Sequence, residues 1–136
     1  MLYKATGQEK GRILLIEDEK ALADTIGNLF SCMDYSVQVF HSCKDASFTA
    51  MTEKYDCILS DLRVEVKDAA AHLFEQIRSQ RTGANFKTPI LVLSGYIDEQ
   101  FMLKHAAKIQ GAFVKPCDYD IVLKKIESIL GHKSAA

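Results

Sequence analysis

The chain has 136 residues, a length typical of one domain, and 48% of them are hydrophobic, which is enough for a buried core. Its 17 basic and 18 acidic side chains leave a formal net charge of -1, so no whole-chain attraction for nucleic acid or for an anionic membrane is expected. No apolar stretch is long enough to cross a bilayer, and the N-terminus lacks the apolar middle of a secretory signal. The four cysteines show no C-x-x-C spacing, so we interpret them as reduced thiols of a cytoplasmic protein.

The first part of the chain predicts a short leader, then a strand, a helix and a second strand. Residues 1–11 are polar and lack periodicity, which predicts a leader without defined structure. The apolar run 12–16 predicts a buried strand of a parallel sheet, and it ends abruptly in acidic residues. Apolar residues then recur at steps of three and four over 22–33, which predicts a helix with one buried face. The β-branched residues of 36–40 predict the next strand.

The middle of the chain repeats this alternation of helix and strand. Ser42 is placed to cap a helix that runs to about residue 54. A second apolar run, residues 57–60, ends in Asp61 and predicts another buried strand. Apolar side chains between Ala70 and Ile77 then mark one face of a further helix.

The last third of the chain predicts two more strands and two more helices. One apolar run ends in Ser94 and another ends in Lys115, and each predicts a buried strand. The helix between these strands is expected to end at Gly111. Its inner face is predicted at three apolar positions: Met102, Ala106 and Ile109. Asp118 is placed to cap the last helix.

Five strands that alternate strictly with five helices predict an α/β fold, a parallel sheet with helices on both faces. Right-handed crossovers make such a fold doubly wound. The carboxyl ends of parallel strands share one edge of the sheet, where ligands bind. Five chemically active residues are therefore expected to meet at this edge: Glu17, Asp18, Asp61, Ser94 and Lys115.

The acids at two strand ends indicate a divalent cation. Carboxylates that lie close together repel one another, and burial increases this repulsion, so a cation among them is expected. Mg²⁺ fits, because it takes hard oxygen ligands and typically uses one or two carboxylates together with phosphate. The alternative is that Glu17, Asp18 and Glu19 only favour the start of the first helix. That explains Glu19, but it does not explain the separate acid Asp61.

Asp61 is the candidate nucleophile, because a carboxylate can attack a phosphoryl donor and form an aspartyl phosphate. Lys115 would hold a phosphoryl oxygen as a compact cation. Ser94 would donate its hydroxyl to another phosphoryl oxygen. Taken singly, Ser94 is also compatible with an ordinary turn at a strand end. Lys115, taken singly, is also compatible with a solvated surface lysine. Their joint placement at strand ends favours the functional interpretation.

These residues, in this order, resemble the receiver domain of response regulators of two-component signalling, and the resemblance covers about residues 11–130. The markers are an acidic pair, a phosphoacceptor, a small hydroxyl residue with a small neighbour, and a lysine followed by proline: Glu17 and Asp18, Asp61, Ser94 and Gly95, Lys115 and Pro116. We therefore expect a leader at 1–11, a receiver domain at 12–131 and a C-terminal tail at 132–136.

The resemblance implies a flavodoxin-like (βα)5 fold with a five-stranded parallel sheet of order 2-1-3-4-5. It implies phosphotransfer from a histidine kinase, or from a histidine phosphotransfer protein, onto Asp61. Mg²⁺ would be held by Asp18, Asp61 and the backbone carbonyl of Arg63, with Glu17 acting through water. The bond between Lys115 and the proline after it is expected to be cis.

The implied role is regulatory, and the only chemistry expected is the domain's own phosphorylation and dephosphorylation. Phosphorylation would shift the surface formed by the fourth helix, the fifth strand and the fifth helix, and a downstream protein would bind there. We expect no direct contact with nucleic acid and no contact with a membrane. A homodimer is left open.

Several positions depart from the family pattern. Glu65 replaces the usual proline after the phosphoacceptor, and Ala69 replaces a usual glycine. The position of the usual switch aromatic holds Ala112, and Phe113 is expected to point to the opposite face of its strand, into the core. Tyr96 is a candidate substitute, although an exposed loop tyrosine is the simpler interpretation.

Bulky side chains at two positions that flank the phosphoryl group, Arg63 and Tyr96, predict a long-lived phosphoryl group.

Alternative functions are open at this point. A flavin binder would need a loop rich in Ser, Thr and Gly where this chain has acids, and a haloacid-dehalogenase-type phosphatase would need an acid in place of Arg63. Two further alternatives are a degenerate receiver used as a phosphorylation-independent binding module, and a receiver excised from a hybrid histidine kinase.

Overall fold

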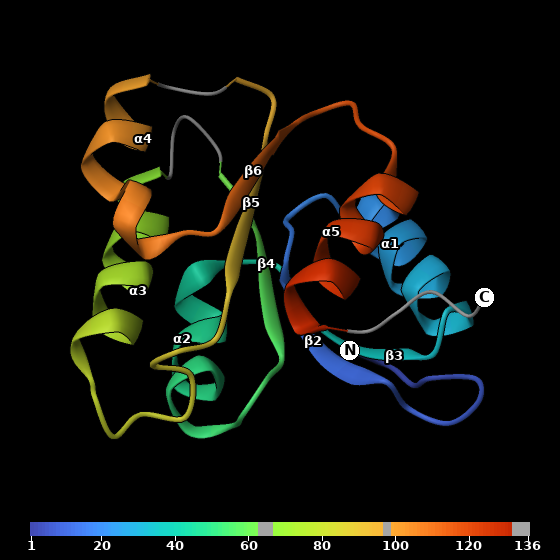
Figure 1. Ribbon diagram of the computed structural model, residues 1–136. Helices are drawn as coiled ribbons and strands as arrows, with labels where there is room; N and C mark the ends of the chain where they lie inside the picture. The colour runs from blue at the N-terminus through green and yellow to red at the C-terminus, as the bar shows by residue number, and fades with distance from the viewer. Residues whose placement is uncertain (63–66, 97–98, 132–136) are drawn as a thin grey trace.

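The computed structural model of the protein describes residues 1–62, 67–96 and 99–131. Figure 1 shows a central sheet with α1 and α5 on one face and α2 and α3 on the other. The elements in chain order are β1 (Leu2–Tyr3), β2 (Gly11–Ile16), α1 (Lys20–Cys32), β3 (Tyr35–Phe40), α2 (Cys43–Thr52), β4 (Cys57–Asp61), α3 (Lys67–Ser79), β5 (Ile90–Ser94), α4 (Glu99–His105), the 3-10 turn η2 (Ala106–Lys108), β6 (Gly111–Val114) and α5 (Tyr119–Leu130).

The sheet has the order β1-β3-β2-β4-β5-β6. Its five parallel strands, β3-β2-β4-β5-β6, have the order 2-1-3-4-5 that the family resemblance implies, so the predicted doubly wound fold is confirmed. The register pairs Ile16 with Ser60, and Ser94 with Val114. All five parallel strands therefore end at one edge, which we call the carboxyl edge.

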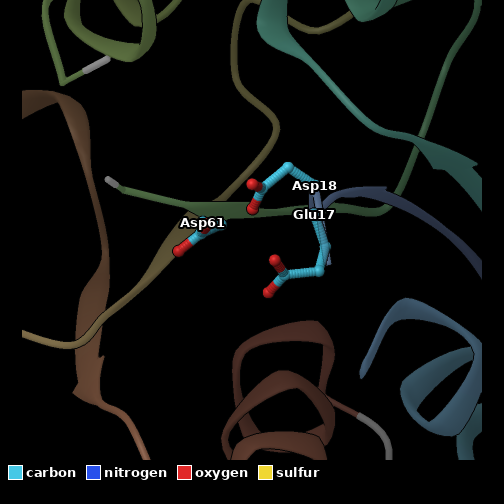
Figure 2. A group of neighbouring side chains, drawn as sticks. All are labelled: Glu17, Asp18 and Asp61. Carbon is cyan, nitrogen blue, oxygen red and sulfur yellow. The ribbon is translucent and has the colours of Figure 1, made fainter. Parts of the chain in front are cut away.

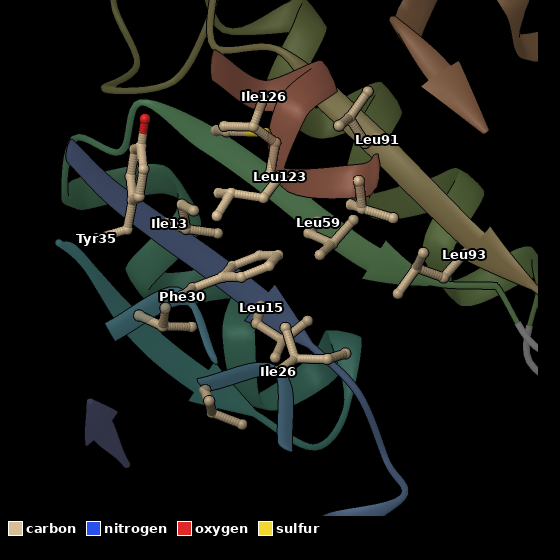
Figure 3. Close-up of a cluster of buried hydrophobic side chains, with 14 of the residues drawn as sticks. Ile13, Leu15, Ile26, Phe30, Tyr35, Leu59, Leu91, Leu93, Leu123 and Ile126 are labelled. Atoms are coloured by element: carbon tan, nitrogen blue, oxygen red, sulfur yellow. The ribbon is translucent and has the colours of Figure 1, made fainter. Parts of the chain in front are cut away.

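Each face of the sheet is covered by its own apolar cluster, which explains why the strands are continuous apolar runs. Ile13 and Leu15 of β2 point to one face, where Phe30 of α1 and Ile126 of α5 pack against them (Figure 3). Leu14 points to the other face, toward α2 and α3. Fully buried residues on that second face include Ile58, Ile90, Phe74 and Ile77. Burial on both faces holds the strand ends in fixed positions relative to one another.

The expected leader without defined structure is wrong at residues 2–3. They form β1, which pairs antiparallel with β3, Leu2 opposite Gln38, so the described sheet has six strands rather than five. The ring of Tyr3 lies against α1 at Gly27, where an added Cβ would come within 2.6 Å of the ring. The Tyr3 hydroxyl donates to Asp24 Oδ1 at 2.6 Å. A strand this short gives no periodic pattern, so these contacts with distant residues define it.

The helix before β6 ends earlier than predicted. Helix α4 ends at His105, a 3-10 turn follows, and Gly111 is the first residue of β6 rather than a helix stop. Phe101 and His105 face inward and their rings lie 4.5 Å apart, whereas the predicted inner residue Ala106 is exposed. Ile109 is buried as expected, but it lies beyond the helix.

The two predicted helix caps are confirmed. The side chain of Ser42 accepts a hydrogen bond from the Asp45 N–H at 3.1 Å, and Asp118 accepts from the Asp120 N–H at 2.9 Å. None of the helices within 1–62, 67–96 and 99–131 has the length and apolar character that a membrane crossing requires.

The edge where strands β4, β5 and β6 begin, which we call the amino edge, is held by polar side chains bonded to the backbone. Asn85 is 1% exposed, and its Nδ2 donates to the carbonyls of Ala50 at 2.6 Å and Glu53 at 2.7 Å. Its Oδ1 accepts from the Tyr55 N–H at 2.9 Å. One buried amide therefore ties the end of α2 to the start of β4.

Arg78, in the last turn of α3, completes the amino edge. Its guanidinium donates to the carbonyls of Phe86 at 2.9 Å and Thr88 at 2.7 Å, just before β5. It also donates to the carbonyl of Lys108 at 3.1 Å and to Oε1 of Gln110 at 3.1 Å, just before β6. Burial lowers the pKa of Arg78. The acceptors in these four bonds are neutral oxygens, so this cation is held by dipoles.

Candidate functional site

Three carboxylates gather at the carboxyl edge, as the sequence predicts (Figure 2). Glu17 and Asp18 follow the last residue of β2, and Asp61 is the last residue of β4. Because β2 and β4 are paired neighbours, their ends lie side by side. Each of the three residues offers an oxygen, and these oxygens lie within 4.8 Å of one another. This donor set suits a hard divalent cation such as Mg²⁺.

Lys115 extends into the same cluster from the residue after β6. Its Nζ lies 2.6 Å from Glu17 Oε1 and 3.0 Å from Asp61 Oδ1. The Glu17 side chain is fully buried, and the Lys115 side chain is 19% exposed. The bond between Lys115 and Pro116 is cis, as the resemblance implies. The ammonium therefore lies beside the carboxylates, as the strand-end argument requires.

The charges of the cluster are unbalanced, with three carboxylates beside one ammonium. Burial raises the pKa of Asp61, and the nearby Glu17 raises it further, which outweighs the opposite effect of Lys115. Burial by itself would lower the pKa of Lys115, but its hydrogen bonds to Glu17 and Asp61 outweigh burial and raise it. The cluster thus keeps Lys115 charged, and its excess of carboxylates over ammonium groups favours the binding of a further positive charge.

Ser94 lies at the same edge, at the end of β5, and is 1% exposed. Its Oγ lies 2.9 Å from the carbonyl oxygen of Leu62, the residue after Asp61. The backbone N–H of Tyr96 donates to Ser94 Oγ at 3.2 Å. The hydroxyl therefore links the end of β5 to the backbone that follows the candidate nucleophile.

The positions at which the sequence departs from the family pattern, or is expected to shield the phosphoryl group, are described only in part. Arg63 and Glu65 lie outside the described residues. Phe113 is half-buried and packs against the cluster under α1 and α5, and Ala112 packs against the cluster on the opposite face, so the prediction that Phe113 points toward the core is confirmed. The Tyr96 side chain is 68% exposed.

The sequence did not indicate two further residues near the cluster. His41, directly after β3, has its Nδ1 2.8 Å from the backbone carbonyl oxygen of Glu17. Tyr119 begins α5, and burial, then Cys117, then the charges of Glu17 and Asp61 raise the pKa of its phenol. A histidine or tyrosine next to an element boundary has no periodic or motif signal, so only the fold brings these residues to the site.

Comparison with known proteins places the chain in a family. The profile of the response regulator receiver domain matches residues 13–127. The chain is 28% identical over 123 residues to an uncharacterized transcriptional regulatory protein, YvcP, of Bacillus subtilis, covering 88% of this chain and 48% of that protein. It is 29% identical over 129 residues to the transcriptional regulatory protein GlrR of Escherichia coli, covering 91% of this chain and 27% of that protein. The chain thus spans about half, or less, of these relatives.

Solved structures show the same fold. The non-phosphorylated receiver domain of HemR from Leptospira biflexa has a TM-score of 0.77 and 22% identity, with 93% of this chain and 99% of that chain covered. The receiver domain of the sensor histidine kinase PA1611 from Pseudomonas aeruginosa has a TM-score of 0.74 and 23% identity, with 89% and 98% covered. The latter structure has a magnesium ion coordinated in its active site cleft. With the family profile over most of its length, this chain belongs to the response regulator receiver domains of two-component systems.

Proposed function

We propose that this domain takes a phosphoryl group from a phosphohistidine onto Asp61, with Mg²⁺ bound in the acidic cluster, and acts in the cytoplasm. The phosphoryl donor would be a histidine kinase or a histidine phosphotransfer protein. One observation carries the proposal: the Lys115 ammonium lies 3.0 Å from Asp61 Oδ1 inside a cluster of three carboxylates. A nucleophile, a set of metal ligands and a phosphoryl-binding cation thus share one place.

Asp61 is the proposed nucleophile. One of its carboxylate oxygens attacks phosphorus and forms a P–O bond, while the P–N bond to the donor histidine breaks and its electron pair returns to the imidazole nitrogen. The attack needs the ionised carboxylate, but the pKa of Asp61 is raised by burial and by Glu17. Added positive charge in the cluster therefore favours the reactive form.

The chemistry of the donor set supports Mg²⁺. The proposed ligands are Asp18 and Asp61, with the backbone carbonyl of Arg63 taken from the family pattern and lying outside the described residues. When bound, the ion would neutralise the incoming phosphoryl oxygens and orient them. Both carboxylate oxygens of Glu17 are already engaged, Oε1 by Lys115 and Oε2 by the Glu19 N–H at 3.1 Å. This engagement supports a role for Glu17 through water rather than by direct ligation.

Lys115 and Ser94 are the proposed contacts to the transferred group. The Lys115 ammonium would pass from Asp61 Oδ1 to a phosphoryl oxygen, and the Ser94 hydroxyl would leave the Leu62 carbonyl for another. A hydrogen bond to a charged group contributes about 1.5–3 kcal/mol. Inverting a 1:99 equilibrium to 99:1 needs about 5.5 kcal/mol, so both contacts together are required.

The proposed output surface is formed by α4, β6 and α5, and its partner would be a downstream protein. Ser94 and Lys115 lie at the ends of β5 and β6, so their movement shifts the loops that lead into α4 and α5. Leu103, Val114 and Ile121 are exposed apolar side chains on the three elements of this surface. With Ala112 at the aromatic position, the shift would be carried by backbone movement around Ser94.

The alternative functions lack a supporting observation. A flavin phosphate would be repelled by the buried carboxylate of Glu17 and by its acidic neighbours in the loop after β2. A binding module independent of phosphorylation would not require Lys115 to be held beside Asp61.

Beryllofluoride, a mimic of an aspartyl-bound phosphoryl group, tests the proposal. With Mg²⁺ present, it is expected to bind the wild-type domain and to shift amide NMR signals near Ser94 and Lys115. The Asp61→Asn variant keeps the size of the side chain and is expected to lose both effects. Equal binding by wild type and variant would contradict the role of Asp61.

A further inference from the structure

The backbone of the acidic pair lies outside the sheet. Strand β2 ends at Ile16, and the Glu17 N–H still bonds to β3, but strand pairing does not extend to the peptide that follows. One planar peptide group joins the two acids and contains the Glu17 carbonyl and the Asp18 N–H. The orientation of this peptide determines where both side chains start. A residue that fixes the peptide therefore positions two of the three carboxylates.

His41 makes such a contact from the neighbouring strand. It follows the last residue of β3, and its Nδ1 lies 2.8 Å from the Glu17 carbonyl oxygen. A carbonyl oxygen only accepts hydrogen bonds, so Nδ1 carries the proton and donates. The preceding residue, Phe40, accepts a hydrogen bond from the Glu17 N–H at 2.9 Å. Phe40, which ends β3, therefore binds the Glu17 N–H, and His41, which follows it, binds the Glu17 carbonyl.

The side chain of Glu17 continues this line of contacts toward the nucleophile. Its Oε2 accepts from the Glu19 N–H at 3.1 Å, which fixes the carboxylate. Its Oε1 lies 2.6 Å from Lys115 Nζ, and that nitrogen lies 3.0 Å from Asp61 Oδ1. Glu17 is fully buried, so water does not compete for these bonds. The contacts therefore run without a break from the His41 ring to Asp61.

We propose that His41 is a positioning residue for Lys115: its ring fixes Glu17, and the Glu17 carboxylate then holds the ammonium beside Asp61. The proposal rests on the proposed function, because it concerns how ready Lys115 is to receive a phosphoryl oxygen. A long side chain that is already ordered loses less conformational entropy when it binds. The contact on which this role depends is the one between His41 Nδ1 and the Glu17 carbonyl oxygen.

Substitutions of His41 test whether its hydrogen bond to Glu17 affects binding at Asp61 or is only a surface contact. Asparagine places an amide N–H close to the position of Nδ1, whereas glutamine places its amide one bond further out, near Nε2. The affinity for beryllofluoride is measured by NMR titration at saturating Mg²⁺. His41→Ala and His41→Gln are expected to weaken it by about two- to tenfold, the range for ordering one long side chain. His41→Asn is expected to restore most of the loss.

His72→Ala is the matched control, because it removes an exposed histidine from α3. Its affinity for beryllofluoride is expected to equal that of the wild type. Thermal unfolding of every variant checks that the domain is folded at the titration temperature. A folded His41→Ala or His41→Gln variant with wild-type affinity would overturn the proposal.

A double variant tests whether His41 acts through Glu17. In a Glu17→Gln background the pairing with Lys115 loses its charge, so adding His41→Ala is expected to weaken beryllofluoride binding less than it does in the wild type. The same fold-change in both backgrounds would overturn the proposal. If the wild type itself fails to bind beryllofluoride with Mg²⁺, the proposed function fails. If the wild type binds and His41 makes no difference, only the positioning role fails.

Discussion

The two edges of the sheet both bury polar side chains, but they satisfy them in opposite ways. At the amino edge, Asn85 bonds to two carbonyls and one N–H, and Arg78 bonds to neutral oxygens. At the carboxyl edge, the Lys115 ammonium contacts two of three clustered carboxylates, and the pKa of Asp61 is raised. At the amino edge, folding alone gives these buried polar groups their hydrogen-bond partners. At the carboxyl edge, added positive charge would lower the electrostatic free energy of the clustered carboxylates.

This difference assigns stability and response to opposite ends of the same strands. Buried polar groups with neutral, fixed partners stabilise the native packing and have no further ligand to bind. Buried groups of like charge oppose folding until a ligand compensates them. Changes at the amino edge should therefore alter the free energy of unfolding and leave ligand binding unchanged. Changes at the carboxyl edge should alter ligand binding, and removal of a carboxylate there should not lower the free energy of unfolding of the metal-free protein.

The largest expected effect is at the amino edge. Asn85→Ala leaves the carbonyls of Ala50 and Glu53 and the Tyr55 N–H without their partner. Unsatisfied buried groups cost about 1–3 kcal/mol each, and partial rescue by water leaves an expected loss of roughly 3 kcal/mol in the free energy of unfolding. Urea denaturation measures it. Asn28→Ala, on the exposed side of α1, is the control and should change the free energy by less than about 0.5 kcal/mol. A loss at Asn85 no larger than at Asn28 would contradict the comparison.

The second effect is stabilisation by Mg²⁺ at the carboxyl edge. A ligand that binds only the folded state at 100 times its Kd stabilises it by about 2.7 kcal/mol. Wild type and Asn85→Ala are both expected to gain this amount, while Asp18→Asn and Asp61→Asn gain much less. Thermal unfolding over a range of Mg²⁺ concentrations measures it. An equal gain in all four proteins would place the magnesium elsewhere.

The third effect is the pH dependence of stability without metal. The pKa of Asp61 is raised in the folded protein above its ordinary value of 3.8, so the folded state binds this proton more tightly than the unfolded state. Its contribution to stability is present below the unfolded pKa and is lost as the pH rises through the folded pKa. Metal-free Asp61→Asn is therefore expected to be more stable than wild type at neutral pH, with the difference shrinking toward pH 4. Urea denaturation across this pH range would contradict the prediction if the wild type were the more stable at neutral pH.

The smallest effect concerns the lifetime of the phosphoryl group. Arg63 and Tyr96 are the two bulky residues predicted to impede an attacking water. The Arg63→Ala, Tyr96→Ala double variant is expected to lose its phosphoryl group faster than wild type, by less than about tenfold, which corresponds to roughly 1.4 kcal/mol in the barrier. Loss of radioactive phosphate over time measures it. Slower loss from the double variant would show that these side chains do not shield the site.

The carboxyl edge could be predicted from the sequence because its residues stand at the ends of apolar runs. Parallel strands bring such ends together whatever lies between them, so the proximity of Glu17, Asp61 and Lys115 followed from topology alone. The fold and the strand order of the parallel part were predictable for the same reason, and the caps at Ser42 and Asp118 followed from local chemistry.

The remaining features depend on contacts between distant residues. β1 has two residues, too few for any period, and is defined by its pairing with β3 and by the contact of Tyr3 with Gly27. The end of α4 was misplaced because apolar residues continue past it, while the inward face is set by Phe101 and His105. His41 reaches Glu17 only because β3 lies beside β2 in the sheet.

Phosphorylation of Asp61 is the central claim, and one measurement tests it most directly. The wild-type domain is incubated with acetyl phosphate and Mg²⁺, and intact-mass spectrometry follows the addition of phosphoryl groups. The account predicts one added group, mapped by peptide fragmentation to Asp61, that is absent without Mg²⁺ and absent in Asp61→Asn. A phosphoryl group at another residue, or the same addition in Asp61→Asn, would contradict it.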